Sequence, residues 1–258
     1  MHHLLGLPTE VILWVFESFD SLRDALHLSQ CCKDLNKLFN HQRYQAKILE
    51  SIVIGDKLPL PKSPDANWLE VHFGAGSLWR PTESELPVRL TDPDTRKFLT
   101  TVGFPLVQCT GIDWESNGLK TSVDAGVELY EYDADEIFGR RWADDDSPPV
   151  NFCYNFGCIG GNAMAMVNAE DGSITHYDLG GYDERADRGW IASSMPSLLV
   201  LLGTMEMVIN RIGEVQQELS DEAFENLRTT TFCQVREIMA DYDDCVDDGS
   251  YFWDALFE

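Results

Sequence analysis

The sequence predicts an α+β protein in three parts: a small N-terminal three-helix segment (4–50), a connector (51–95) and an acidic α+β domain (96–258). Three observations support this division. Six consecutive apolar residues at 11–16 are typical of a helix with no polar face. Short apolar runs separated by turn residues indicate a mainly antiparallel sheet. Apolar residues at helical spacing after Ser193 indicate C-terminal helices.

The N-terminal segment begins with a helix that is apolar on all sides. Pro8 suits the first helical turn, and Glu10 places an anion near the positive end of the helix dipole. A second short helix carries Leu26, and a third is predicted at 30–49. A segment of about 45 residues cannot bury the whole circumference of its first helix by itself. Side chains such as Trp14 therefore need cover from the rest of the chain or from another protein.

The connector at 51–95 is rich in Pro and Gly, which interrupt helices and strands. After it, a short helix is predicted at 96–102, ending at Gly103. Asp171-Gly172 predicts a two-residue hairpin turn. The expected strands are 106–109, 127–132, 150–159, 163–168 and 173–179.

Two helices are predicted near the C-terminus. Ser193 or Ser194 can cap the first, and Ser220 or Asp221 begins the second, which reaches about Met239. The last eighteen residues hold seven acidic and no basic side chains, a pattern that favours a solvated acidic tail.

The distribution of charge differs along the chain, and the net charge restricts the classes of partner that are expected. The protein has 19 Lys and Arg against 44 Asp and Glu, a net charge of −25. Residues 1–50 hold five basic and six acidic residues, a net of −1, so the remainder carries −24. A chain this acidic repels phosphate backbones and anionic lipid, so neither nucleic acid nor membrane is expected as a partner. A basic protein surface is the natural target.

Cysteine usage and hydropathy predict an intracellular protein. The seven cysteines form no CxxC pair, which argues against a disulfide framework and a zinc ribbon. The longest uninterrupted apolar run, 198–202, is too short to span a bilayer.

Residues 7–38 resemble the F-box motif. The shared features are the Leu-Pro-x-Glu start at 7–10, the aliphatic first helix and the Ser-x-x-Cys-Lys segment at 29–33. Cys31, where an aliphatic residue is commoner, and the aromatic residues of the first helix depart from the motif. The resemblance implies that these helices bind the linker subunit of an SCF-type cullin ubiquitin ligase.

This resemblance implies a non-enzymatic substrate-recognition adaptor in the cytoplasm, the nucleus or both. The N-terminal helices would bind the linker subunit, and the acidic domain would bind a client protein of basic character. Buried aliphatic contacts dominate such interfaces. The side chains expected to make them are Leu7, Pro8, Ile12, Val15, Leu28 and Leu35.

The second part resembles the SUKH family. Residues 96–105 look like that family's opening "FL…vGlP", and the hairpin at 160–179 followed by Ile-Ala-Ser-Ser-Met at 191–195 is similar to its ending. Ala192 departs from the usual Asn. Such domains are α+β binding modules of bacterial toxin immunity proteins and fungal cell-wall regulators. Their combination with an F-box implies a fungal source.

No motif predicts an active site. The best calcium candidate, 244–249, places Val246 where a ligand is required. The acids at 178–187 are interspersed with arginines, which favours surface ion pairs. His176 is expected to be structural, and Cys158 has no identifiable base. We therefore expect no catalytic residue, no metal and no cofactor.

Two alternatives stay open. One is a SUKH-like interaction or regulatory module acting outside ubiquitin transfer, with the N-terminal helices folded into its own core. The other, which the sequence favours less, is a metal-dependent enzyme that uses the acidic loops.

Overall fold

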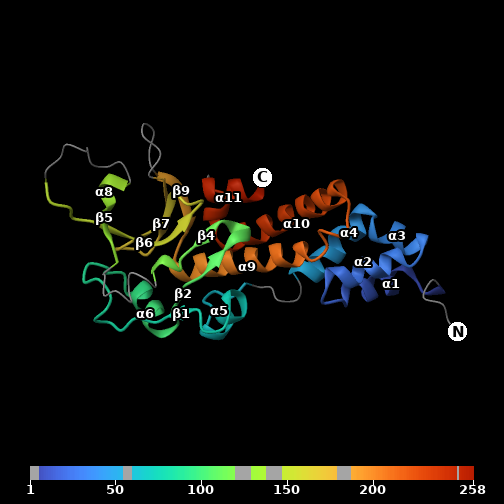
Figure 1. The fold of residues 1–258 in the computed structure, drawn as a ribbon, viewed down its shortest axis with the longest axis horizontal. Coiled ribbons are helices and arrows are strands. Elements are labelled where there is room, and N and C mark those ends of the chain that lie inside the picture. The colour runs from blue at the N-terminus through green and yellow to red at the C-terminus, as the bar shows by residue number, and fades with distance from the viewer. Residues whose placement is uncertain (1–5, 55–59, 120–128, 138–146, 179–186, 249) are drawn as a thin grey trace. The chain divides into compact units, whose positions relative to one another are not determined.

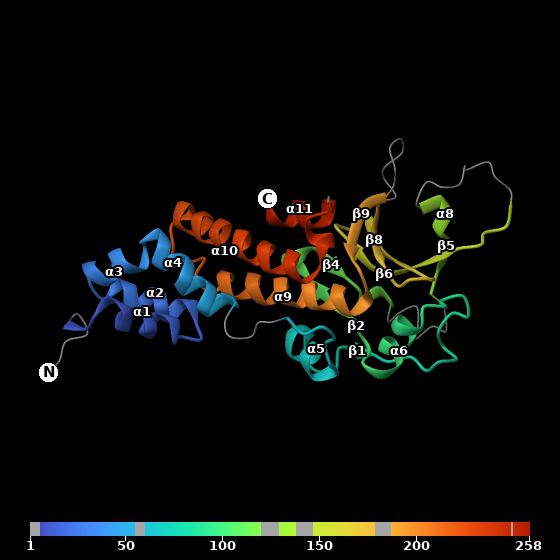
Figure 2. The same ribbon diagram turned by 180° about the vertical axis from the view of Figure 1, so that it is seen from behind.

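The computed structural model describes residues 6–54, 60–119, 129–137, 147–178, 187–248 and 250–258. The chain forms two compact units (Figures 1 and 2). The helical unit comprises residues 1–60, 207–238 and Phe257, and the sheet unit comprises 61–206, 239–256 and Glu258. The sequence placed residues 207–238 in the second domain, whereas their contacts group them with the N-terminal helices.

The helical unit opens with four α-helices and a π-helical turn. They are α1 (Thr9–Glu17), α2 (Leu22–Gln30), α3 (Lys33–Phe39), α4 (Gln42–Leu49) and η2 (Glu50–Ile54). The helix predicted at 30–49 is thus divided, because the chain turns at Asn40, whose side chain donates to the carbonyl of Asn36 at 2.9 Å. The end of α9 (Met195–Gly213) and most of α10 (Asp221–Tyr242) complete the unit, and α4 lies beside α10 in both views (Figures 1 and 2).

The core of the helical unit joins distant parts of the chain. Phe16 is fully buried, and its ring centroid lies 5.7 Å from that of Phe39. A small cavity of about 40 Å³ between the elements is lined from both ends of the sequence, by Leu22, Leu26, Phe39, Val215, Leu219 and Leu227 among others. The N-terminal helices and residues 215–227 therefore share one apolar core.

The sheet unit is built on a seven-stranded sheet in which the described strands pair antiparallel, which confirms the predicted α+β class (Figure 1). Its order is β3 (Gln108–Cys109), β4 (Trp114–Glu115), β6 (Phe152–Ile159), β7 (Ala163–Asn168), β8 (Ile174–Asp178) and β9 (Asp187–Ala192). The short strand β5 (Glu131–Asp133) pairs with the start of β6. Separately, β1 (Leu78–Trp79) pairs with β2 (Phe104–Pro105).

The β7–β8 hairpin lies where the sequence predicts it, with a longer turn. The N–H of Gly172 donates to the carbonyl of Asn168 at 3.0 Å, and the N–H of Asn168 donates to that of Ser173 at 2.9 Å. Four residues, 169–172, therefore make the turn instead of two. Gly172 has φ +70°, a conformation that favours glycine. Part of the strand predicted at 127–132 lies outside the described residues.

The remaining helices belong to the sheet unit. They are α5 (Ala66–Phe73), α6 (Pro93–Thr101), η4 (Thr110–Ile112), α8 (Ala134–Ile137), the start of α9, η5 (Asp244–Val246) and α11 (Tyr251–Phe257), whose Phe257 groups with the helical unit. Helix α5 lies within the predicted connector. Helix α6 begins three residues before the predicted Arg96, because Asp92 caps it by accepting from the N–H of Thr95 at 2.7 Å and Pro93 occupies the first position.

Helix α9 supplies the core of the sheet unit. Its residues 198–202 are all fully buried. By length and composition alone α9 could cross a membrane, but 67% of the apolar stretch is buried within the protein, as in an ordinary core helix.

The acidic C-terminal segment is folded, a point that the sequence left open, and most of its acidic side chains are exposed. The C-terminal residues form η5 and α11, and Phe252 and Trp253 are buried. The indole N–H of Trp253 donates to the carbonyl of Ile191 at 2.8 Å, so the end of the described chain is attached to β9.

Candidate functional site

Helix α1 buries one side and leaves the other partly open. Ile12, Leu13 and Phe16 face the core of the helical unit. With 100° between successive residues, Val11, Trp14 and Val15 point to the opposite side. Trp14 is 66% exposed, whereas Val11 and Val15 are half-buried. We call the surface made by Leu7, Pro8, Val11, Trp14 and Val15 the α1 face.

The six residues predicted to bind a linker subunit are divided between surface and core. Leu7, at 39% exposure, and Pro8 are exposed, while Val15 and Leu28 are half-buried. Ile12 and Leu35 are 7% and 4% exposed and pack inside the helical unit. Trp14, which the prediction left out, is the most exposed apolar side chain of α1. Six consecutive apolar residues give no hint of which side faces inward, so the sequence could not choose between them.

The orientation of α1 is fixed at its C-terminal end. The Lys47 ammonium lies 2.9 Å from a carboxylate oxygen of Glu17, and the Ser51 hydroxyl donates to the backbone carbonyl of Glu17 at 2.9 Å. Both contacts come from the α4–η2 segment. The α4–η2 segment therefore fixes the position of α1 and of the α1 face.

Residues 207–238 in turn contact the α4–η2 segment. The Arg211 guanidinium donates to the carbonyls of Ile52 and Val53 at 2.8 and 2.6 Å. Burial lowers the pKa of Arg211, although Glu214 and Asp20 act in the opposite direction. These hydrogen bonds fix the end of η2 to α9.

A surface ion pair adds to this attachment. Arg23 on α2 lies 2.7 Å from Glu218, in the segment between α9 and α10, and His27 lies 2.8 Å from the same carboxylate. The Arg23 and His27 side chains are about half exposed, so these contacts add orientation more than stability.

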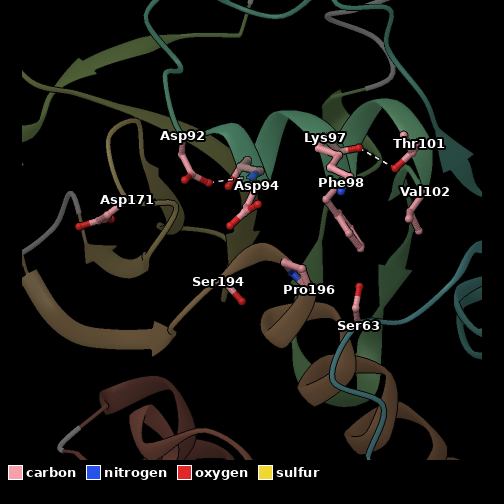
Figure 3. A pocket seen from close by; sticks show the side chains of 11 residues that line it. Ser63, Asp92, Asp94, Lys97, Phe98, Thr101, Val102, Asp171, Ser194 and Pro196 are labelled. Atoms are coloured by element: carbon pink, nitrogen blue, oxygen red, sulfur yellow. Dashed lines mark hydrogen bonds between the residues drawn. The ribbon is translucent and has the colours of Figure 1, made fainter.

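A second candidate site is a pocket in the sheet unit beside α6, with a volume of about 340 Å³ (Figure 3). We call it the α6 pocket. In Figure 3, Phe98 points from α6 into it, Pro196 at the start of α9 lies on the opposite side, and Asp171 lies on the β7–β8 hairpin. Asp92 and Asp94 stand at the N-terminal end of α6.

The carboxylate end of the α6 pocket is held together by the backbone. The N–H groups of Thr91 and Asp92 both donate to the carbonyl of Ala169 at 2.8 Å. A Cβ on Gly172 would lie 2.6 Å from the Asp92 carboxylate and from the Thr95 hydroxyl, so the hairpin approaches α6 as closely as glycine permits. Residues about 80 positions apart in the sequence are thus in contact, and local sequence patterns do not predict such contacts.

A buried carboxylate holds the start of α9. Asp243 is 5% exposed and accepts from the N–H and hydroxyl of Ser193, each at 2.9 Å, from the Ser197 hydroxyl and from the N–H of Cys245. Burial by itself would raise the pKa of Asp243, but these hydrogen bonds lower it below its ordinary value. Its charge is thereby retained near the N-terminus of a long helix, where an anion is favoured.

Four further side chains that could carry chemistry lie in the sheet unit. Cys109 and Cys245 have pKa values raised to about 12, chiefly by burial, which disfavours the reactive thiolate. Cys158 is half-buried on β6, and the ring of His176 packs edge-on to Phe252 with centroids 6.4 Å apart. Within the described ranges, no three His, Cys, Asp or Glu side chains gather to hold a metal ion. Gly249 of the calcium candidate and, among the acids at 178–187, Asp183 and Glu184 lie outside those ranges.

The fold is of the α+β class: an antiparallel sheet forms one unit, and C-terminal helices pack in it. Residues 64–258 match the SUKH-4 immunity protein family. The chain therefore belongs to the SUKH-4 family, which confirms the family resemblance found in the sequence. The match begins within the predicted connector, so the F-box resemblance of the preceding residues stays a prediction. No curated protein and no solved structure matches the chain.

Proposed function

We propose that this protein is a non-enzymatic adaptor that binds one protein through the α1 face and another through its SUKH-4 domain. The observation that carries the proposal is the exposure of Trp14. It alone is exposed among the tryptophans that the structure describes, and it lies on a helix whose opposite side is packed in a core. Leaving a tryptophan in water forfeits a large burial energy, and exposed aromatic side chains are the typical anchors of protein interfaces.

The partner of the α1 face is proposed to be the linker subunit of an SCF-type cullin ubiquitin ligase, on the strength of the F-box resemblance at 7–38. Leu7, Pro8, Trp14 and Val15 would contact it. Ile12 and Leu35 would act from within by shaping the helices, since both are buried. The ligase would supply the chemistry, and the adaptor would supply proximity and orientation of the client.

The client is proposed to be a basic protein bound by the SUKH-4 domain. The family name refers to immunity proteins, and the charge of this chain supports a positively charged target. Of the net −25, −24 falls outside residues 1–50. A surface of one sign accelerates encounter with a partner of opposite sign and rejects phosphate backbones. The cytoplasm or the nucleus is the proposed location.

A second candidate function is a SUKH-4 interaction module that acts outside ubiquitin transfer. One observation favours it specifically: Val215 and Leu227 share a core with Leu22 and Leu26. The N-terminal helices therefore serve a structural purpose within this chain, whether or not a linker subunit binds them.

Binding of the purified linker subunit to the full-length chain distinguishes the two functions. We expect wild-type protein to bind, and the Trp14→Ala variant to lose about 2 kcal/mol, or roughly thirtyfold in affinity. Val88→Ala is the matched control, because Val88 is an apolar side chain with 91% exposure in the sheet unit. Isothermal titration calorimetry gives both values.

Absence of binding by the wild type, or equal binding by the Trp14→Ala variant, refutes the adaptor function and leaves the second candidate. Substitution of Ile12 is a poor test, because this side chain is buried and its loss would disturb the fold as well as the surface.

A further inference from the structure

We propose that the α6 pocket binds an arginine or lysine side chain presented by the client protein. This inference rests on one part of the proposed function, namely that the SUKH-4 domain binds a client protein. The pocket volume of about 340 Å³ lies at the lower end of the range of about 300–1,000 Å³ found for ligand sites, a size suited to one long side chain.

The lining of the α6 pocket is apolar on one part and anionic on another. Phe98, Val102 and Pro196 supply hydrocarbon surface, and Asp92, Asp94 and Asp171 supply carboxylates (Figure 3). Basic side chains have the same division, because their methylene stems pack on apolar surface while the charged end stays with anions or water. This match of shape and polarity selects a basic side chain over an apolar one.

The charge of the lining excludes an anionic ligand. Three aspartates and Lys97 give a net of −2. The helix N-termini that reach the pocket are already neutralised, since Asp92 caps α6 and Asp243 accepts hydrogen bonds from the start of α9. No positive helix end is left to attract a phosphate or a carboxylate.

Asp94 is the carboxylate that we expect to make the direct contact. It is exposed, and it forms no hydrogen bond or ion pair with the residues that the structure describes. The Asp92 carboxylate is committed to the N–H of Thr95, and that of Asp171 accepts from the N–H and hydroxyl of Ser173. Two carboxylates are thus fixed in place, and a third is free to pair with an incoming cation.

The pocket is formed before any ligand arrives. The hairpin and the start of α6 are joined through the Ala169 carbonyl, and Gly172 packs directly against Asp92 and Thr95. Binding would therefore order few additional side chains, which preserves the affinity of a small contact.

The test uses N-acetyl-arginine methylamide as the probe and the full-length ¹⁵N-labelled protein observed by NMR. We expect saturable amide shifts confined to the start of α6, the β7–β8 turn and the start of α9. N-acetyl-norleucine methylamide, which has the hydrocarbon stem without the charge, should produce no saturable shifts. The double variant Asp94→Asn/Asp171→Asn should weaken arginine binding about fivefold, as expected for two exposed charge contacts.

The control variant Glu115→Gln/Glu170→Gln removes the same charge from exposed positions outside the pocket lining and should bind like the wild type. Shifts that spread over the acidic surface without saturation would overturn the proposal, as would equal effects of the two double variants. Because asparagine retains an acceptor oxygen, the Ser173 contacts survive the substitution. The experiment involves neither the linker subunit nor the α1 face, so its failure is distinct from failure of the adaptor function.

Discussion

The two units of the protein treat their tryptophans differently. In the sheet unit Trp114 and Trp253 are 1% and 0% exposed, whereas Trp14 in the helical unit is 66% exposed. The sheet unit closes its core even over an acidic C-terminal segment. The helical unit recruits residues 207–238 to cover its interior and still leaves the α1 face uncovered. The two most deeply buried tryptophans thus lie in the sheet unit, and the one exposed tryptophan of the described residues lies where we propose that another protein binds.

Deletion of residues 1–50 should have the largest effect on this comparison. It removes the partners of Val215, Leu219 and Leu227, and exposing three aliphatic side chains costs about 5 kcal/mol. We expect residues 207–238 to lose protection and the fragment to self-associate. Hydrogen exchange and size-exclusion chromatography measure these effects. A monomeric fragment with full protection of α10 would contradict the shared core.

Removal of the Asp243 carboxylate should have the next largest effect, this time on the sheet unit. The Asp243→Ala substitution leaves the hydrogen-bond donors of Ser193 and Ser197 without their acceptor, at a cost of about 3 kcal/mol in unfolding free energy. Asp241→Ala, at an exposed position nearby, should change stability by less than about 0.5 kcal/mol. Urea denaturation of the two variants provides the comparison.

The pH dependence of the same site checks its charge. Since folding lowers the pKa of Asp243, its ionised form stabilises the folded state above the ordinary value of 3.8, and this contribution is lost as the pH falls through the lower folded pKa. The stability advantage of the wild type over Asp243→Asn should therefore shrink from about pH 5 to about pH 2. A constant difference over this range would show that the carboxylate is not charged in the fold.

The smallest effect on stability is expected at the α1 face. Trp14→Ala should change the free energy of unfolding by less than about 0.5 kcal/mol, because the side chain is mostly in water. Phe16→Ala, two residues further along the same helix, should cost about 3–5 kcal/mol, because its ring is fully buried against Phe39. Thermal melts monitored by circular dichroism separate the two. A large loss at Trp14 would mean that it is packed in solution.

The sequence predicted the elements whose signals are local. Strand β7 has the predicted bounds of 163–168, and α9 begins where Ser194 was expected to cap it, with the Ser194 hydroxyl accepting from the N–H of Ser197 at 3.3 Å. Alternation and capping depend on neighbours within one element, so they can be read without knowing the fold.

The elements that were missed depend on distant partners. Strand β9 carries Gly189 and charged residues, and it becomes a strand by pairing with β8. The final segment is acidic, yet its Trp253 is buried, and the indole N–H of Trp253 donates to the carbonyl of Ile191. Local composition did not decide whether this segment is ordered, because its aromatic side chains pack against residues distant in the sequence.

For the candidate sites too, the sequence predicted the local features and missed those that depend on distant residues. The need of α1 for cover followed from its uninterrupted apolar run, but the inward side could be chosen only once Ile12 and Phe16 had partners. The Asp-Pro-Asp-Thr sequence at 92–95 is a recognisable helix start. Nothing in it indicates that Asp171 lines the same pocket, because only the β7–β8 hairpin brings that residue to α6.

Asp243 and Trp253 form hydrogen bonds with the 191–197 segment, so this segment can complete its contacts only late in synthesis of the chain. While the chain is being synthesised, β9 and the start of α9 emerge from the ribosome without their acceptor and their covering indole. The SUKH-4 domain can reach its final state only after residue 253 has been added. Nascent chains halted before that point should remain open to proteases and dependent on chaperones.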